Sequence, residues 1–171
     1  MRTWQRVALA SSVASLVPLA GVWGAEIIGL WLSEDKEAVI DVRAYDGELR
    51  GRIVWLEPPP DKQAEELRDV HNKDESRRDQ KILGMFILWG FQEKSEEGLK
   101  WSGGWIYDPK NGKTYKCKLA LKGAERLDIR GYVGISVFGR TTHWTRITDD
   151  ELDARSTPEP PPEPSELLPE P

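Results

Sequence analysis

Cysteine and histidine are scarce in this chain, which has one cysteine and two histidines among 171 residues. A single thiol, Cys117, excludes an internal disulfide. We expect it to be a small buried apolar residue, because a cysteine nucleophile needs an activating base nearby. His71, Cys117 and His143 do not have the spacing of metal ligands. We therefore predict no metal and no cofactor.

Recognisable catalytic motifs are missing as well. The sequence contains neither a glycine-rich phosphate-binding loop nor a G-x-S-x-G nucleophile motif. A pair of carboxylates for hydrolysis stays open as the one catalytic alternative, although no pair stands out among the many acidic residues. We predict no catalytic residues, and an enzyme is the least favoured of three function classes.

The chain has no excess of positive charge. Between residues 26 and 148, 21 acidic side chains balance 21 basic ones, whereas residues 149–171 carry eight acids and one arginine. A nucleic-acid-binding protein would show a basic face or stripe, so no nucleic-acid partner is predicted. Seven of the 12 prolines lie from Ser156 onward. We predict that residues 149–171 form a disordered acidic tail, either a solubilising segment or a spacer or partner-binding arm.

No apolar run in the chain is long, and the one near the N-terminus has a recognisable setting. Residues 7–17 follow two arginines and precede small residues that lead to Gly24 and Ala25. This is the arrangement of a secretory signal peptide, and the run is shorter than the roughly 20 residues of a spanning helix. We predict that residues 1–25 are removed, which leaves no integral membrane span; a retained anchor is the alternative. The protein is then expected to be periplasmic or secreted.

What the chain does contain is a series of short strand patterns separated by turns. We count eight, at residues 27–32, 38–45, 49–57, 82–91, 99–109, 113–121, 127–134 and 140–147. An antiparallel chain of eight strands removes its edges by closing on itself, and its interior then holds side chains or one small ligand. We predict one all-β domain, residues 26–148, forming an eight-stranded antiparallel up-and-down barrel, with a flat sandwich as the alternative.

One connection in this series is long. Residues 58–81 begin with three prolines and are highly charged. A loop of this length in a compact domain is often functional, for example as a lid. A solvated surface excursion is equally compatible with the composition.

The segment GGWIYDPKNGKTYKCKL, residues 103–119, predicts a β-hairpin because its Asp-Pro and Asn-Gly pairs are turn residues. The register stays open. A four-residue turn after Asp108 places Trp105 opposite Lys116 on the polar face, whereas a three-residue turn places it opposite Cys117 in the core. In either case four alternate residues of the first strand are expected to share a face: Trp101, Gly103, Trp105 and Tyr107.

Tryptophan is abundant, with six of the eight tryptophans inside the predicted domain. One interpretation is an aromatic core; the other is a cavity lined by some of these rings with a few polar groups, as in ligand pockets. Arg130 points to solvent if the aliphatic face of its strand fills the core. The candidate ligand-binding residues are Trp55, Trp89, Trp105, Tyr107, Arg130, Tyr132 and Trp144.

Four segments, GLWLSED, DGELRGRIVWL, GGWIYDPKNGKTYKCKL and LDIRGYVGISVFGRTTHWTR, resemble an exported bacterial family named domain of unknown function 2147, over about residues 29–146. The resemblance implies a lipocalin-like barrel without an established activity and suggests a small apolar or amphipathic ligand. In the family's central loop motif Lys73 replaces a proline, and Gln80 and Lys81 replace Arg-Pro. The motif positions that fit are Asp69, Asn72, Asp74, Arg78 and Gly84.

The expected function is therefore small-ligand binding by an exported barrel. The alternative is a protein-interaction module of the cell envelope, which would show a large exposed apolar patch. The oligomeric state is not predictable from these patterns.

Overall fold

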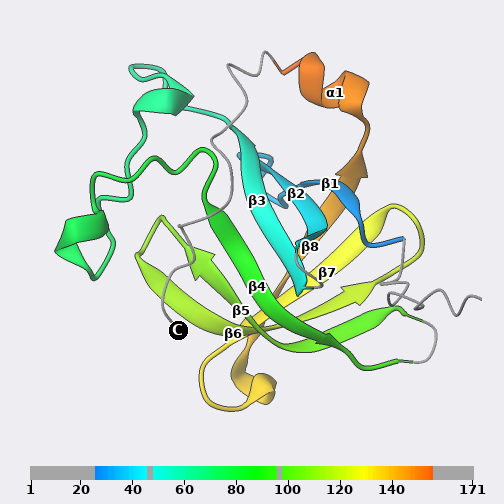
Figure 1. Ribbon diagram of the computed structural model, residues 1–171. Coiled ribbons are helices and arrows are strands. Elements are labelled where there is room, and N and C mark those ends of the chain that lie inside the picture. Colours follow the sequence, from blue (N-terminus) through cyan, green and yellow to red (C-terminus); the bar gives the residue numbers. More distant parts are fainter. Residues whose placement is uncertain (1–25, 46–47, 96–97, 156–171) are drawn as a thin grey trace, which may run out of the picture.

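A closed antiparallel barrel dominates the computed structural model, which describes residues 26–45, 48–95 and 98–155 (Figure 1). Each strand pairs with its neighbours in the chain, and the first pairs with the last. The strands are β1 (Gly29–Leu32), β2 (Ala38–Tyr45), β3 (Glu48–Leu56), β4 (Phe86–Glu93), β5 (Lys100–Asp108), β6 (Lys113–Leu121), β7 (Arg126–Tyr132) and β8 (Arg140–Ile147). The predicted eight-stranded up-and-down barrel is confirmed.

Apolar side chains are packed closely inside the barrel. Trp31, Trp101 and Leu127 are each at most 1 % exposed. Two glycines show how tight the interior is. A Cβ added at Gly51 would lie 2.9 Å from a methyl group of Leu88, and one added at Gly104 would lie 2.4 Å from the ring of Phe91. Side chains rather than empty space therefore occupy the barrel at these levels.

The β5–β6 hairpin has the longer of the two turns that its sequence allows. Asp108 pairs with Lys113, which leaves four residues in the turn, and Trp105 lies opposite Lys116. Asn111 and Gly112 provide the turn conformation, with Gly112 at φ 66°.

The prediction that alternate residues of β5 from Trp101 to Tyr107 share one face is wrong, because a β-bulge interrupts the strand. The register shifts between Trp101 and Gly104, where Gly103 has φ 82°. A bulge adds one residue to one strand and so reverses the faces that follow it. Trp101 therefore lies in the core, whereas Trp105 and Tyr107 lie on the opposite face of the strand.

One end of the barrel is closed by a stacked pair. The guanidinium of Arg146 lies 4.2 Å from the centre of the Trp31 ring, and Trp31 Nε1 donates a hydrogen bond to the carbonyl of Ile27. Arg146 also donates to the carbonyls of Ala124 at 2.6 Å and Ile28 at 2.9 Å. A single side chain thus links β8 with the start of β1 and with the β6–β7 turn.

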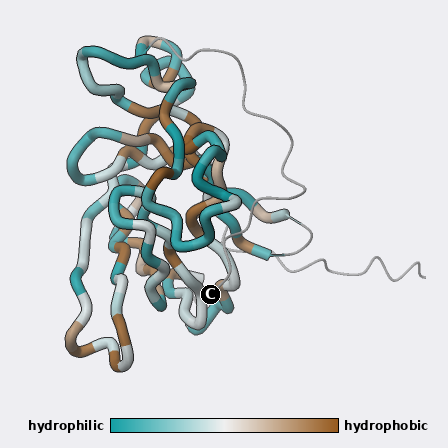
Figure 2. Tube along the Cα trace, turned by 90° about the vertical axis from the view of Figure 1, so that its left-hand side faces the viewer, coloured by the Kyte–Doolittle hydropathy of each residue, from teal (hydrophilic) through white to brown (hydrophobic). Residues whose placement is uncertain are grey.

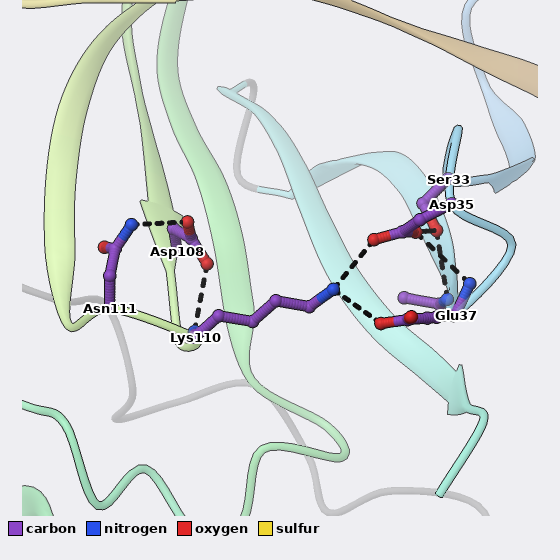
Figure 3. Close-up of polar contacts among 7 residues, drawn as sticks. Ser33, Asp35, Glu37, Asp108, Lys110 and Asn111 are labelled. Atoms are coloured by element: carbon purple, nitrogen blue, oxygen red, sulfur yellow. Dashed lines mark hydrogen bonds and ion pairs between the residues drawn. The ribbon is translucent and has the colours of Figure 1, made fainter.

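An ionic clasp bridges the other end, from which the β1–β2, β3–β4, β5–β6 and β7–β8 connections leave. Lys110 of the β5–β6 turn reaches the β1–β2 turn, where its Nζ lies 2.8 Å from Asp35 and 2.5 Å from Glu37 (Figure 3). Ser33 donates to the same Asp35 carboxylate. All three charged side chains are about half exposed.

The long β3–β4 connection is fixed to the β5–β6 hairpin by a buried polar group. Asp69 is fully buried, and its carboxylate accepts hydrogen bonds from the Tyr107 hydroxyl at 2.7 Å and the Asn72 amide at 2.6 Å. Burial and the hydrogen bond to Asp69 raise the pKa of the Tyr107 hydroxyl. The carbonyl of His71 packs so closely on Gly112 that a Cβ there would be 1.7 Å away.

Four of the five loop positions that fit the motif have structural roles in this chain: Asp69, Asn72, Asp74 and Arg78. Asp74 caps a short 3₁₀ turn, η2 (Glu75–Arg77), by accepting a bond from the Ser76 amide. Arg78 Nε donates to the carbonyl of Asn72 at 2.9 Å. Together with a second short turn, η1 (Ala64–Glu66), these contacts hold the loop in a defined conformation against the hairpin.

The structure describes the segment after β8 up to Arg155, and the rest of the predicted tail, from residue 156 onward, lies outside the described residues. A helix, α1 (Asp149–Asp153), begins where a disordered tail was expected, because Thr148 and Glu151 form a capping box. Trp55 Nε1 donates to the carbonyl of Arg155 at 2.9 Å. The helix residue Leu152 packs against an apolar cluster, separate from the main core, made of Leu30, Leu32, Val39, Trp55 and Ile147. Among the described residues, no helix has the length and apolar character to cross a membrane.

We expect α1 to stabilise the barrel, because it covers apolar surface. A chain that ends at Thr148 should be less stable than one that ends at Arg155 by about 1–3 kcal/mol, measured by urea unfolding. Both chains lack residues 156–171, so the difference reports the helix alone. Equal unfolding midpoints would show that α1 contributes nothing.

The ion pairs of Lys110 with Asp35 and Glu37 should stabilise the fold only above acidic pH. Burial raises the pKa of Asp35, but hydrogen bonds from Lys110, Ser33 and the backbone outweigh it, so this pKa lies below its ordinary value. Lys110→Ala should lower the free energy of unfolding by less than about 1 kcal/mol near neutral pH, because the pair is exposed. A lowered carboxyl pKa gives stability that is present above the unfolded value, about 3.9, and is lost as the pH falls below it.

The measurement is the free energy of unfolding of the wild type and of Lys110→Ala as a function of pH. The difference should vanish as Asp35 is protonated and shrink in high salt. Lys113→Ala, at an exposed lysine of the same hairpin, is the matched control. A difference that persists at the acid end of the series would contradict an ionic origin.

Candidate functional site: a basic groove across β5 to β8

The aromatic residues proposed from the sequence do not form one site. Trp144 lies in the core, opposite Leu127. Trp55 belongs to the apolar cluster under α1. Trp89 and Trp105 face each other across β4 and β5, and Tyr107 is bound to the β3–β4 loop. Trp89, Tyr107 and Trp144 belong to the main hydrophobic core and Trp105 packs against it, so these side chains contribute to packing.

The remaining two candidates lie on the outside of the barrel. Leu127 and Ile129 of β7 are buried, so Arg130 and Tyr132 point outward, as expected if the aliphatic face fills the core. Arg130 lines a groove of about 410 Å³ that crosses β5, β6, β7 and β8. Of the seven candidate ligand-binding residues, Arg130 alone is among those that line this groove.

The groove is strongly basic. Five of its lining residues are cationic and one is acidic, and the others are apolar or carry a hydroxyl. The cations are Lys94, Lys100, Lys118, Lys122 and Arg130, and the acid is Asp128. Among the described residues, neither Lys100 nor Lys122 forms an ion pair. The groove therefore presents a positive potential to solvent.

Strand alternation explains how the lysines come together. In β6, Cys117 and Leu119 are buried, so Lys116 and Lys118 point outward. The register places Lys100 of β5 opposite Ala120 and Arg130 of β7 opposite Lys118. The small Ala120 leaves space between longer side chains. Sequence reasoning missed this site because the lysines come from different strands, although alternating lysines in β6 were a visible signal.

Asp128 does not cancel the positive charge. Its carboxylate lies 2.7 Å from Arg126 Nε and 2.8 Å from His143 Nδ1. Burial raises the pKa of Asp128, but the hydrogen bonds from Arg126 and His143 outweigh it, so the pKa is lower than usual. The negative charge is thus already matched by Arg126, and the lysines remain for an external anion.

Arg130 is held in place by the β7–β8 loop. Its Nε donates to the carbonyl of Ser136 at 2.9 Å, and Nη1 donates to the Thr141 hydroxyl at 2.8 Å. Lys118 Nζ donates to the Ser136 hydroxyl at 3.2 Å and lies 5.6 Å from the centre of the Tyr132 ring. One wall of the groove is therefore preorganised.

Trp101 is among the residues that line the groove, but its side chain belongs to the core. It is 1 % exposed, and its Nε1 has no hydrogen-bond partner among the described residues. A buried donor without an acceptor costs about 1–3 kcal/mol.

The single thiol and the acidic residues offer no other site. Cys117 is fully buried, and burial raises the pKa of its thiol, so the side chain stays protonated and unreactive. Within the described ranges, no group of three or more His, Cys, Asp or Glu residues could hold a metal ion.

Comparison with known proteins agrees with this fold. A family model described as "Uncharacterized protein conserved in bacteria (DUF2147)" matches residues 29–146. A Helicobacter pylori protein, HP1028, described as belonging to the lipocalin family, has a similar structure with a TM-score of 0.65 and 18 % sequence identity. The match covers 77 % of this chain and 90 % of that one. No curated protein matches the chain.

The eight strands, their closed antiparallel order and the match across β1 to β8 support the same assignment. This chain is a lipocalin-like barrel that belongs to the bacterial family DUF2147.

Proposed function

We propose that the protein binds a small amphipathic molecule with an anionic group in the groove across β5 to β8. The observation that carries this proposal is the groove itself, whose volume of about 410 Å³ combines five cations with apolar atoms of Trp101, Leu119 and Ala120. Ligand pockets in proteins span roughly 300–1,000 Å³ and place a few polar groups in a mostly apolar lining.

The groove suits a ligand better than the barrel interior does. Close packing at Gly51 and Gly104 leaves no room at these levels for a guest without displacement of Leu88 or Phe91. In the groove, Lys100 and Lys122 would bind the anionic group. The apolar part of the ligand would lie along Ala120 and the aliphatic stems of the surrounding lysines.

We also propose that the protein works in the periplasm or outside the cell. The support is the signal-peptide pattern of residues 1–25, which lie outside the described residues. A protein-interaction module of the cell envelope is the second candidate function, because four large apolar side chains are exposed on the β7–β8 loop.

The ligand proposal predicts a charge-dependent affinity. Dodecyl phosphate below its micelle concentration is the probe, titrated by calorimetry into the chain of residues 26–171. Lys100→Glu with Lys122→Glu should weaken binding by at least about tenfold, because two attractive charges become repulsive.

Lys73→Glu, at an exposed lysine of the β3–β4 loop, makes a charge reversal of the same kind away from the groove and should leave the affinity unchanged. Dodecyl maltoside, with the same tail and a neutral head, should not compete. The proposal fails if the probe does not bind, or if the groove variant, folded by circular dichroism, binds as tightly as the wild type.

A further inference from the structure

The β7–β8 loop, residues 133–139, exposes large apolar side chains that the ligand groove does not use. Val133 is 74 % exposed, Ile135 62 %, Val137 75 % and Phe138 81 %. Elsewhere in the described residues Val70 is the single large hydrophobic side chain that is exposed in this way. The loop projects from the barrel with a hydrophobic tip (Figure 2). Four such side chains on one short loop mark an interaction surface.

The exposure is built into the backbone of the loop. A 3₁₀ turn, η3 (Ser136–Phe138), forms its tip, and Arg130 Nη2 donates to the carbonyls of Ser136 at 2.6 Å and Val137 at 3.2 Å. Gly139 packs so closely that a Cβ there would lie 2.6 Å from the carbonyl of Gly131. The loop is thus held with its apolar side chains turned away from the barrel.

The surroundings of the loop are basic. No acidic residue occurs from residue 129 to 148, and none occurs in β6. Lys116 and Lys118 of β6 lie opposite Tyr132 and Arg130 in the register, and Arg140 follows the loop at the start of β8. All three of these cations beside the loop are exposed.

We propose that this loop docks the protein on the surface of an anionic lipid bilayer. Its four apolar side chains enter the boundary between head groups and acyl chains, while Lys116, Lys118 and Arg140 contact anionic head groups. Apolar side chains beside clustered cations are the pattern of proteins that lie on membranes. A protein partner is less well matched, because a stable interface needs about 800 Å² on each side and this surface is a narrow projecting tip.

The proposal shares Lys118 with the ligand groove but does not require the groove, since Lys116, Arg140 and the apolar residues of the loop are not among the residues that line it. Docking on a bilayer would place the protein where an amphipathic ligand is available. The two proposals can therefore fail separately.

The test is co-sedimentation of the chain of residues 26–171 with vesicles. This chain keeps every described strand and helix and omits the apolar run near the N-terminus. Vesicles of phosphatidylglycerol and phosphatidylcholine in equal parts should bind the wild type, and vesicles of phosphatidylcholine alone should bind it much more weakly. Val137→Ser with Phe138→Ser should lower the partition coefficient by at least about tenfold, because inserted apolar groups are lost.

Two further variants sharpen the result. Lys116→Glu with Arg140→Glu should weaken binding by more than about tenfold on anionic vesicles and should remove most of its salt dependence. Val70→Ser is the matched control, because it removes an exposed valine from a different loop, and it should bind like the wild type.

The outcomes separate the alternatives. Binding of the loop variant at the wild-type level, or no binding of the wild type to anionic vesicles, overturns the proposal. If the wild type instead self-associates in sedimentation velocity and the loop variant does not, the loop is a protein interface and the membrane proposal is wrong. Unchanged dodecyl phosphate affinity in the loop variant would show that the groove is intact, so a loss of vesicle binding would belong to the loop.

Discussion

Closure of the sheet between β1 and β8 is the constraint on which the rest of this structure depends. β1 has four residues, and three of them pair with β8. The seam gains further strength from Arg146, which stacks on Trp31 and binds carbonyls on both sides of it. The strands follow chain order around the barrel, so consecutive antiparallel pairings place β5 to β8 side by side and closure returns β8 to β1.

The candidate site lies on the outside of the barrel because packed side chains occupy the interior. Trp31, Trp101 and close contacts at glycines fill the interior, so chemistry directed at a ligand has to come from outward-facing residues. Those residues are mostly cationic on β6 and its neighbours, and their charges balance acidic residues elsewhere in the domain. A near-neutral domain can therefore hold a basic groove, because net charge reports the sum over the surface and not its arrangement.

The sequence predicted the strands well because alternation and turn residues are local signals. It left the β5–β6 register open, and the bulge at Gly103 moved Trp105 and Tyr107 away from the face of Trp101. The groove depends on side chains from several strands whose register is set by closure, so only Arg130 was anticipated. The acidic helix α1 was missed because its order comes from a cap and from tertiary cover rather than from an apolar stripe.

The β1–β8 seam also sets an order of events during folding. Seven of the strand pairings join neighbours in the chain, but Leu30 pairs with Ile147, near the far end of the domain. Contacts between residues far apart in the chain form late, because the entropy lost on closing the intervening loop has to be offset first. Until β8 has emerged and reached β1, both strands remain open edges, which are the places where sheets aggregate. The protein is therefore most vulnerable just before its last pairing forms.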